Sequence, residues 1–305
     1  MHAQELLARR FETHRDHLHA VAYRMLGSAT EADDAVQEAW LRLDRADTSD
    51  VENLAGWLTT VVSRICLDML RSRTARREDP IDRIAEFGDA ADDRDPESEA
   101  VLIDSVGRAL LVVLDTLGPD ERVAFVLHDM FAIPFEQIAP IVGRTGAATK
   151  KLASRARARA HGDATASTAE LAQQRHVVDA FLAAARSGDL EALLAVLAPD
   201  VVRTADPAAL PSGMAPVARG AQAVARETVM LRRRSRVAAL ALVDGAVGII
   251  VAPRAKLLLA LAVTVTDHRI AGYDVIADPA RLRQLDLAVL PELAPPSVAD
   301  GPEGR

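Results

Sequence analysis

Apolar and polar positions alternate in the first quarter of the chain with the spacing of amphipathic helices. From residue 4 to residue 77 an apolar side chain recurs every three or four positions, which is typical of helices that pack on one another. Start signals agree with this periodicity, because Ser28 and Glu31 form a capping-box pattern and Asn53 can cap a third helix. The pattern therefore predicts an all-helical unit. Its expected helices cover 4–26, 29–45 and 54–77.

Helical periodicity returns from about residue 98 to residue 161 and is interrupted by turn residues. The interruptions are Gly118-Pro119, the Ala-Ile-Pro run at 132–134 and Gly143. After Gly143, Thr145 is the expected N-cap of a helix over 146–160, and Pro140 falls inside the short helix before the turn. A short helix, a glycine turn and a second helix predict a helix-turn-helix.

The last third of the chain changes from helical to period-two patterning, which predicts an α+β domain. Asp244-Gly245 lies between two apolar runs and indicates a hairpin. The expected helices are 170–187 and 190–197, and the expected strands are 236–243, 246–252, 256–266 and 270–276.

Three segments have compositions that cannot form a core. The first, 78–97, is rich in acids with scattered Pro and Gly, 162–168 is small and polar, and 291–305 follows the last periodic run. We therefore expect an acidic linker, a connector and a disordered tail. The predicted division is 1–77, 78–97, 98–161, 162–168, 169–290 and 291–305.

Composition narrows the classes of function. A net charge of -8 over 305 residues argues against a protein that coats nucleic acid indiscriminately, so any DNA contact must be local. The single cysteine, Cys66, lies in an apolar helical stretch and is expected to be a small core residue. The most apolar stretch, 237–265, is interrupted by charged residues, Gly and Pro. We therefore expect a cytoplasmic protein with no membrane contact.

Two neighbouring helices carry opposite charges. On the helix at 29–45, one acidic face with an exposed leucine suits a protein partner, although an ordinary solvated face has the same pattern. This face consists of Asp34, Gln37, Glu38 and Leu41. The next helix gathers arginines toward its end, which favours contact with phosphates or simply offsets the helix dipole. These arginines include Arg64, Arg71 and Arg73.

The second helix of the helix-turn-helix is also basic on its outward positions. In a major groove, such side chains reach base edges near the helix start and phosphates farther along. A helix pair with a solvated basic face is the alternative. The expected outward residues are Thr149, Lys150, Ser154, Arg155 and Arg157.

Three motifs in fixed order resemble extracytoplasmic-function RNA polymerase sigma factors. They are D-D-A-V-Q-E-A-W-L-R at 33–42, W-L-T-T-V-V-S-R at 57–64, and I-A-P-I-V-G through L-A-S-R-A-R at 138–157.

The resemblance implies that Asp34, Gln37, Glu38 and Leu41 dock on the clamp helices of the polymerase β′ subunit, with the β flap as a further contact. It also implies that 45–53 captures an unstacked base of the minus-ten promoter element. Arg64, Arg71 and Arg73 would then hold the promoter there, and the helix-turn-helix would read the minus-thirty-five element.

The last domain resembles the SnoaL-like (nuclear transport factor two-like) fold that a subgroup of these sigma factors carries. Gly188–Leu193 with Leu197–Val202 matches the opening of that fold, and Gly272–Leu282 matches its closing strand. The resemblance implies two all-α sigma domains, the second a helix-turn-helix, followed by an α+β SnoaL-like cone that tunes sigma activity. Such a cone has room for a small-molecule ligand.

Two other functions remain open. A helix-turn-helix repressor or activator would bind duplex DNA without polymerase, and a SnoaL-like isomerase or cyclase fused to a degenerate sigma core would need acid-base residues. The local candidates for the latter are Asp200, Asp206, His268 and Asp274, none with diagnostic spacing. We expect no catalytic residue, cofactor or metal. The arginine cluster at 232–236 is expected to face solvent or the acidic linker.

Overall fold

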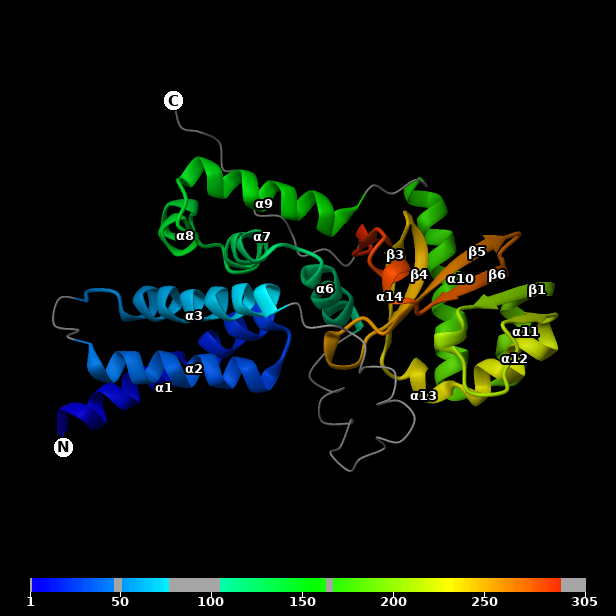
Figure 1. The fold of residues 1–305 in the computed structure, drawn as a ribbon, viewed down its shortest axis with the longest axis horizontal. Helices are drawn as coiled ribbons and strands as arrows, with labels where there is room; N and C mark the ends of the chain where they lie inside the picture. The colour runs from blue at the N-terminus through cyan, green and yellow to red at the C-terminus, as the bar shows by residue number, and fades with distance from the viewer. Residues whose placement is uncertain (1, 47–50, 77–104, 163–166, 292–305) are drawn as a thin grey trace. The chain divides into compact units, whose positions relative to one another are not determined.

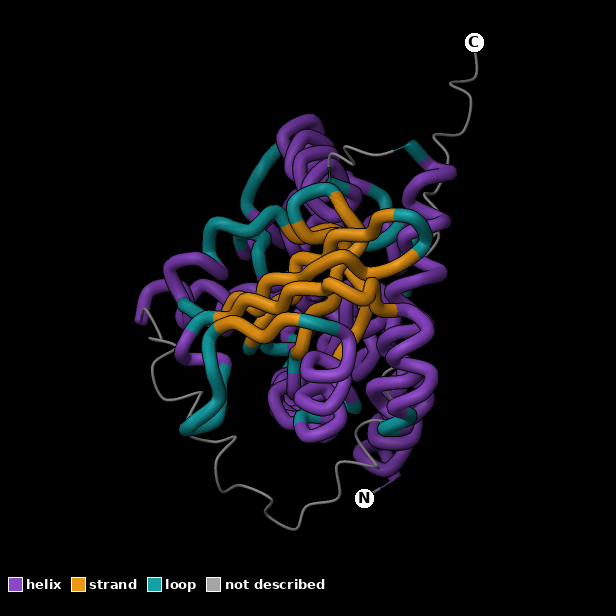
Figure 2. Tube along the Cα trace, turned by 90° about the vertical axis from the view of Figure 1, so that its right-hand side faces the viewer, coloured by secondary structure: helices purple, strands orange, loops and turns teal. Residues whose placement is uncertain are grey.

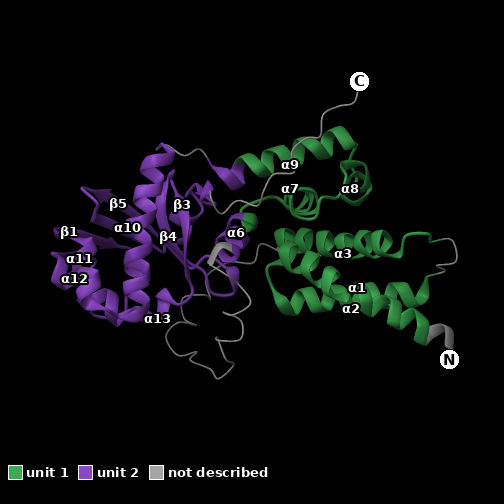
Figure 3. Cartoon of the chain, turned by 180° about the vertical axis from the view of Figure 1, so that it is seen from behind, with its two compact units in different colours: residues 1–78, 114–158, 295–305 green, residues 79–113, 159–294 purple. Residues whose placement is uncertain are grey.

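The computed structural model describes residues 2–46, 51–76, 105–162 and 167–291 (Figure 1). These residues fall into two compact units, which Figure 3 colours separately. Unit 1 contains the described residues up to 76 and 114–158, and unit 2 contains 105–113 and 159–291. The predicted acidic linker, the middle of the predicted connector and nearly all of the predicted tail lie outside the described residues.

Unit 1 begins with three helices, as predicted: α1 (His2–Leu26), α2 (Ala29–Arg45) and α3 (Leu54–Arg76). The Ser28 hydroxyl accepts from the Glu31 N–H at 3.4 Å, and the Asn53 carboxamide oxygen accepts from the Gly56 N–H at 2.9 Å. Both predicted caps are therefore confirmed. The Glu31 carboxylate pairs with Arg73 and does not complete a capping box.

The three helices share one core, in which Phe11, Leu18, Met25 and Leu58 are almost fully buried. Cys66 is part of this core, as predicted, and desolvation raises the pKa of its thiol to about 12. A thiol that stays protonated at neutral pH is a poor nucleophile. Cys66 is therefore a packing residue.

The second helical part contains the predicted helix-turn-helix. Gly143 has a φ of +69° and ends the first helix of the pair, and the Thr145 hydroxyl accepts from the Ala148 N–H at the start of the second. Pro140 does not interrupt the first helix, which ends two residues later. Gly146 is the first residue of the second helix, where glycine costs less than in an interior. The elements are α6 (Ser105–Asp115), α7 (Pro119–Phe125), the π-helix η2 (Val126–Met130), α8 (Phe135–Val142) and α9 (Gly146–His161).

Unit 2 is built on a seven-stranded sheet with the order β2-β1-β6-β5-β4-β3-β7. Figure 2 draws its twisted strands in orange. The β1–β6 pair is parallel and the other pairs are antiparallel. The strands are β1 (Leu197–Ala205), β2 (Val217–Arg219), β3 (Ala238–Val243), β4 (Ala246–Val251), β5 (Leu259–Thr266), β6 (Arg269–Ile276) and β7 (Leu287–Ala288). The helices are α10 (Thr168–Ser187), α11 (Leu190–Val196), α12 (Ala221–Met230), α13 (Arg232–Ser235) and α14 (Pro279–Leu282), with 3-10 turns η3 (Pro207–Ala209) and η4 (Pro253–Ala255).

Two tight turns connect neighbouring strands in the middle of the sheet. Asp244 and Gly245 both have positive φ, and Val243 pairs with Ala246 across them. The predicted hairpin is therefore confirmed, since two positive φ values are the mark of a two-residue type I′ turn. Asp267 and His268 make an equivalent turn between β5 and β6.

The predicted fold class, helical units followed by an α+β SnoaL-like domain, is confirmed. The predicted strands are present, although the third begins at Leu259 because Pro253–Ala255 forms a 3-10 turn. The pattern did not predict α12, α13, α14, β2 and β7, which are short or only weakly periodic, and β1 was expected only from the resemblance to the SnoaL-like fold. Among the described residues, no helix combines the length and the hydropathy that a membrane span requires.

Candidate nucleic-acid interface and the cavity of unit 2

The outward face of α2 has the acidic and apolar character that the sequence indicated. Asp34 and Gln37 are exposed, and Leu41 is 38% exposed although it is a large apolar side chain. Glu38 belongs to the same face and accepts from Arg42 one turn later at 2.9 Å. Because the opposite stripe is buried in the core of unit 1, this face is left for a partner. We call Asp34, Gln37, Glu38 and Leu41 the α2 face.

The arginines of α3 lie where predicted but are engaged within unit 1. The Arg64 guanidinium donates to the Pro140 carbonyl of α8 at 3.4 Å, and Arg71 pairs with Asp120 of α7 at 2.8 Å. Arg73 is partly buried, where it donates to the Leu26 carbonyl at 3.2 Å and pairs with Glu31. Arg73 thus ties α3 to the turn between α1 and α2.

The outward face of α9 differs from the prediction at its start. Lys150, Ser154 and Arg155 are exposed. Thr149 is fully buried, and its hydroxyl donates to the Thr145 carbonyl at 2.9 Å, so the prediction that it points outward is wrong. A threonine one turn after the N-cap satisfies its hydroxyl on the helix backbone, which lets its methyl group join the core.

Arg157 is only partly exposed because it pairs with a buried acid. Its Nε donates to the Asp129 carboxylate of η2 at 2.6 Å, and that carboxylate is 4% exposed. A carboxylate buried this deeply requires a close cation, so Arg157 holds α9 against η2. Arg155 pairs with Glu121 of α7 at 3.4 Å but stays mostly exposed. Arg155 can therefore still turn toward a ligand, whereas Arg157 is held in the packing of unit 1.

Asp120 binds one arginine from α3 and one from the turn of the helix-turn-helix. Its carboxylate accepts from Arg71 of α3 at 2.8 Å and from Arg144, beside the helix-turn-helix turn, at 3.4 Å. Both arginines are about half exposed, so phosphate groups could replace Asp120 as their anion. The same two arginines can therefore pair either with Asp120 or with another anion.

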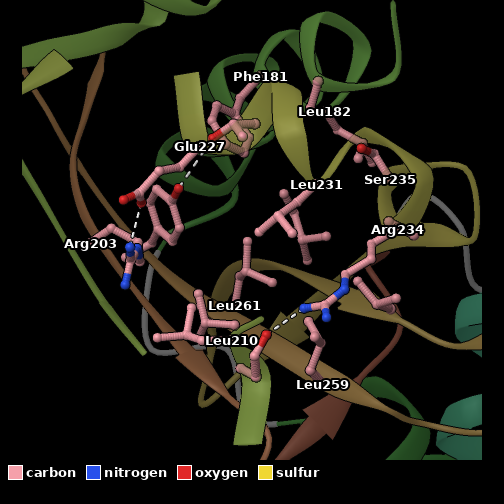
Figure 4. Close-up of a pocket in the computed structure, with 18 residues that line it drawn as sticks. Phe181, Leu182, Arg203, Leu210, Glu227, Leu231, Arg234, Ser235, Leu259 and Leu261 are labelled. Atoms are coloured by element: carbon pink, nitrogen blue, oxygen red, sulfur yellow. Dashed lines mark hydrogen bonds and ion pairs between the residues drawn. The ribbon is translucent and has the colours of Figure 1, made fainter. Parts of the chain in front are cut away.

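Unit 2 contains a cavity of about 90 Å³, partly open to solvent, between its sheet and the α10, α12 and α13 helices (Figure 4). Most of its walls are apolar, with Phe181 and Leu182 from α10, Leu231 beside α13 and Leu261 from β5. The acid-base candidates named from the sequence do not line this space, whereas Arg234 of the arginine cluster does, and the walls come from elements that are far apart along the chain. The polar groups on the walls are Arg203, Glu227, Thr228, Arg234, Ser235 and Tyr273.

The polar groups at one side of the cavity satisfy one another. Arg203 is 3% exposed, pairs with Glu227 and donates to the Ala215 carbonyl at 2.9 Å. The hydroxyls of Tyr273 and Thr228 are 3.4 Å apart. Desolvation by burial raises the pKa of Tyr273, so the phenol stays protonated at neutral pH. This side of the cavity is neutral overall.

Arg234 lies on the side of the cavity opposite Arg203 (Figure 4), and this position corrects a prediction. The cluster at 232–236 was expected to face solvent or the linker, and Arg232, Arg233 and Arg236 are indeed exposed. Arg234 instead lines the cavity, where it donates to the Ala209 carbonyl. Desolvation lowers the pKa of Arg234, although an arginine remains charged at neutral pH.

The acid-base candidates do not line this cavity. Asp200 is exposed on β1, and His268 lies in the β5–β6 turn within 3.0 Å of Gln173. Asp206 and Asp274 do meet, but both pair with Arg281. Burial alone would raise the pKa of Asp206, and it is lowered because the N–H groups of 277 and 278 and the Arg281 guanidinium outweigh burial.

Asp206 and its neighbours thus brace β1 against the end of β6, and a carboxyl whose pKa is lowered is a poor general acid. Within the described residues, no group of His, Cys, Asp and Glu side chains is placed to hold a metal ion.

Comparison with known proteins gives consistent results. The family model described as Sigma-70 region 2 matches residues 10–76. The ECF RNA polymerase sigma factor SigJ of Mycobacterium tuberculosis (strain ATCC 25618 / H37Rv) is 39% identical over 298 residues, which cover 88% of this chain and 91% of that protein. The probable ECF RNA polymerase sigma factor SigI of Mycobacterium tuberculosis (strain CDC 1551 / Oshkosh) is 43% identical over 198 residues, which cover 64% of this chain and 68% of that protein.

Among solved structures, the crystal structure of the Mycobacterium tuberculosis extracytoplasmic function sigma factor SigJ shares 34% sequence identity with this chain. The match covers 90% of this chain and 98% of that one, with a TM-score of 0.43.

Proposed function

The chain belongs to the extracytoplasmic-function family of RNA polymerase sigma factors, and we propose that unit 1 makes its polymerase and promoter contacts while unit 2 adjusts their strength. As a sigma factor it binds core RNA polymerase and directs initiation at selected promoters. The division of roles between the units, and the residues below, are the proposal.

The α2 face is the proposed docking surface for the clamp helices of the polymerase β′ subunit. The observation that carries this assignment is the exposed Leu41 beside Asp34 and Gln37, on a helix whose other stripe is buried. An apolar anchor ringed by polar and acidic groups has the anatomy of a protein interface, and its charge favours a basic partner. A further contact of the helix-turn-helix with the β flap is proposed from the family alone.

For the promoter, we assign α3 to the minus-ten element and α9 to the minus-thirty-five element. Arg64 and Arg71 are exposed enough to meet phosphates, and Lys150, Ser154 and Arg155 form the outward face of α9. Arg73 and Arg157 support these helices from within, because each pairs with an acid in the packing of unit 1. The segment 45–53, proposed to capture a base, lies partly outside the described residues.

Free protein should bind promoter DNA weakly, because Asp120 competes with phosphates for Arg71 and Arg144. Replacing Asp120→Asn is expected to raise the affinity of the free protein for a promoter duplex roughly two- to fivefold, since exposed ion pairs contribute little each. Fluorescence anisotropy of a labelled promoter duplex at low salt measures this affinity. Asp16→Asn makes the same charge change at an exposed site on α1 and is the matched control. Equal affinities for the two variants would contradict the competition.

Reconstituted transcription tests the function itself. Purified protein with core polymerase is expected to start transcription at one promoter sequence and to shift that promoter in a gel only when core is present. Equally tight promoter binding without core would instead favour the helix-turn-helix repressor. Core polymerase that initiates no better with the folded protein than without it, at every promoter offered, would contradict the proposal outright.

We propose a regulatory rather than a catalytic role for unit 2. Asp206 and Asp274 are engaged with Arg281, so the enzyme alternative lacks an available acid-base pair among the candidates. The cavity offers room for a small ligand that could set the strength of regulation. In the same transcription assay, a chain that ends at residue 165 should differ from the full chain severalfold, and equal rates would argue against regulation by unit 2.

A further inference from the structure

The cavity of unit 2 combines apolar walls with an uneven distribution of charge. Arg203 and Glu227 on one side form an ion pair (Figure 4), and the hydroxyls of Tyr273 and Thr228, which are 3.4 Å apart, line the same cavity. Among the residues that the structure describes, Arg234 on the other side has no such partner. Its guanidinium donates to the Ala209 carbonyl, and within the described part of the chain no carboxylate lies within 4.0 Å of it.

A partly buried cation at the wall of an apolar cavity favours the binding of an anion. A carbonyl oxygen satisfies one N–H of a guanidinium but does not neutralise its charge, and arginine has several further donors. Transfer of an unpaired charge from water into apolar surroundings is costly. The lowered pKa of Arg234 reflects this loss of hydration. The arrangement is therefore favoured when an anion that enters the cavity completes it.

The walls limit what that anion can be. Leu231, Leu259 and Leu261 line the same cavity as Arg234 and offer no hydrogen bonds from their side chains (Figure 4). A sugar or a phosphate would leave most of its polar atoms unpaired there. A cavity of about 90 Å³ is smaller than one that holds benzene, so it best fits a ligand whose apolar part has roughly four or five carbon atoms.

We propose that the cavity of unit 2 binds a small aliphatic monocarboxylate, with its carboxylate on the Arg234 guanidinium and its hydrocarbon part among Leu231, Leu259 and Leu261. The planar guanidinium donates two parallel hydrogen bonds to a carboxylate, which fixes the orientation of the ligand. The inference builds on the regulatory role proposed for unit 2, because occupancy of the cavity would be the signal that unit 2 transmits.

Hexanoate is the probe, and isothermal titration calorimetry with the full chain is the measurement. Hexanoate is expected to bind with a dissociation constant on the order of millimolar or tighter. Hexanamide has the same size without the charge, and it should bind the wild type about tenfold more weakly or worse. Hexanamide binding as tightly as hexanoate would overturn the proposal, and so would the absence of any heat from hexanoate.

Arg234→Gln is the corresponding variant, because it keeps a hydrogen-bonding side chain and removes the charge. It is expected to lower the affinity for hexanoate about tenfold or more and to leave hexanamide binding nearly unchanged. Arg233→Gln removes an exposed arginine of the same short helix and should bind like the wild type. An Arg234→Gln chain that binds hexanoate like the wild type overturns the proposal.

The two-probe comparison on the wild type decides the question even if Arg234→Gln does not fold. Measuring hexanoate binding also tests the ligand independently of the sigma function on which the inference builds. Loss of hexanoate binding in an Arg234→Gln chain that still directs transcription with core supports the cavity assignment. A wild-type chain that transcribes but ignores hexanoate in the calorimeter rejects the ligand class and leaves the sigma function intact.

Discussion

The double variant Asp34→Arg with Leu41→Arg is expected to lose core polymerase affinity by roughly 30-fold or more, with an intact fold. Anchor residues at the centre of an interface each contribute about 2 kcal/mol or more, and a basic face would repel the partner that the acidic face suits. Both side chains are exposed, so neither replacement creates a cavity in the core of unit 1. The affinity is measured by fluorescence anisotropy of labelled protein titrated with core.

A matched pair of replacements on α1 controls for the charge change. Asp16→Arg with Leu6→Arg changes one exposed acid and one exposed leucine, and Leu6 is 61% exposed. This chain is expected to bind core within about twofold of the wild type. Circular dichroism verifies that both variants keep their helices. If the α2 variant bound core like the α1 control, the docking assignment would be wrong.

Glu227→Leu is expected to destabilise unit 2 by about 3 to 5 kcal/mol, the second large effect. Arg203 is 3% exposed, and without Glu227 its charge keeps only the Ala215 carbonyl as a partner that the described residues provide. Breaking a buried ion pair leaves an uncompensated charge, whereas replacing both members with apolar residues is often nearly neutral. Arg203→Met combined with Glu227→Leu should therefore recover most of the lost stability.

Native-state hydrogen exchange of the β1 and β6 amides reads out this change, because a global melting curve of a chain with two units mixes their transitions. Glu191→Leu on the exposed surface of α11 is the control and should change protection by less than about 0.5 kcal/mol. A double variant that loses more protection than Glu227→Leu alone would contradict an ion-pair origin.

Helix boundaries were predictable because the residues that set them are close in sequence. Ser28, Asn53 and Thr145 each bond an N–H three residues ahead, and Gly143 adopts a positive φ at a helix end. The Asp244-Gly245 turn is equally local. Such signals act through backbone groups within one turn, so a single sequence contains all the information they need.

The roles of individual charged side chains were less predictable. Periodicity placed Arg73 and Arg157 on polar faces, but it could not show that Glu31 and Asp129 would draw them into the packing. Thr149 was misplaced because its hydroxyl bonds the helix backbone and frees its methyl group for the core. Whether a charge faces solvent depends on neighbours that only the folded chain brings near.

Local hydrogen bonds and ordered motifs were enough to specify the order of the units, the ends of the main helices, the central hairpin and the family. Only the tertiary structure decided which arginines form ion pairs. It also formed the cavity that has Arg234 on its wall. The cavity walls come from α10, α12, α13 and several strands, and they extend along the chain from Phe181 to Val275. Contacts at such separations leave no local pattern, since each wall residue taken alone has the character of ordinary core.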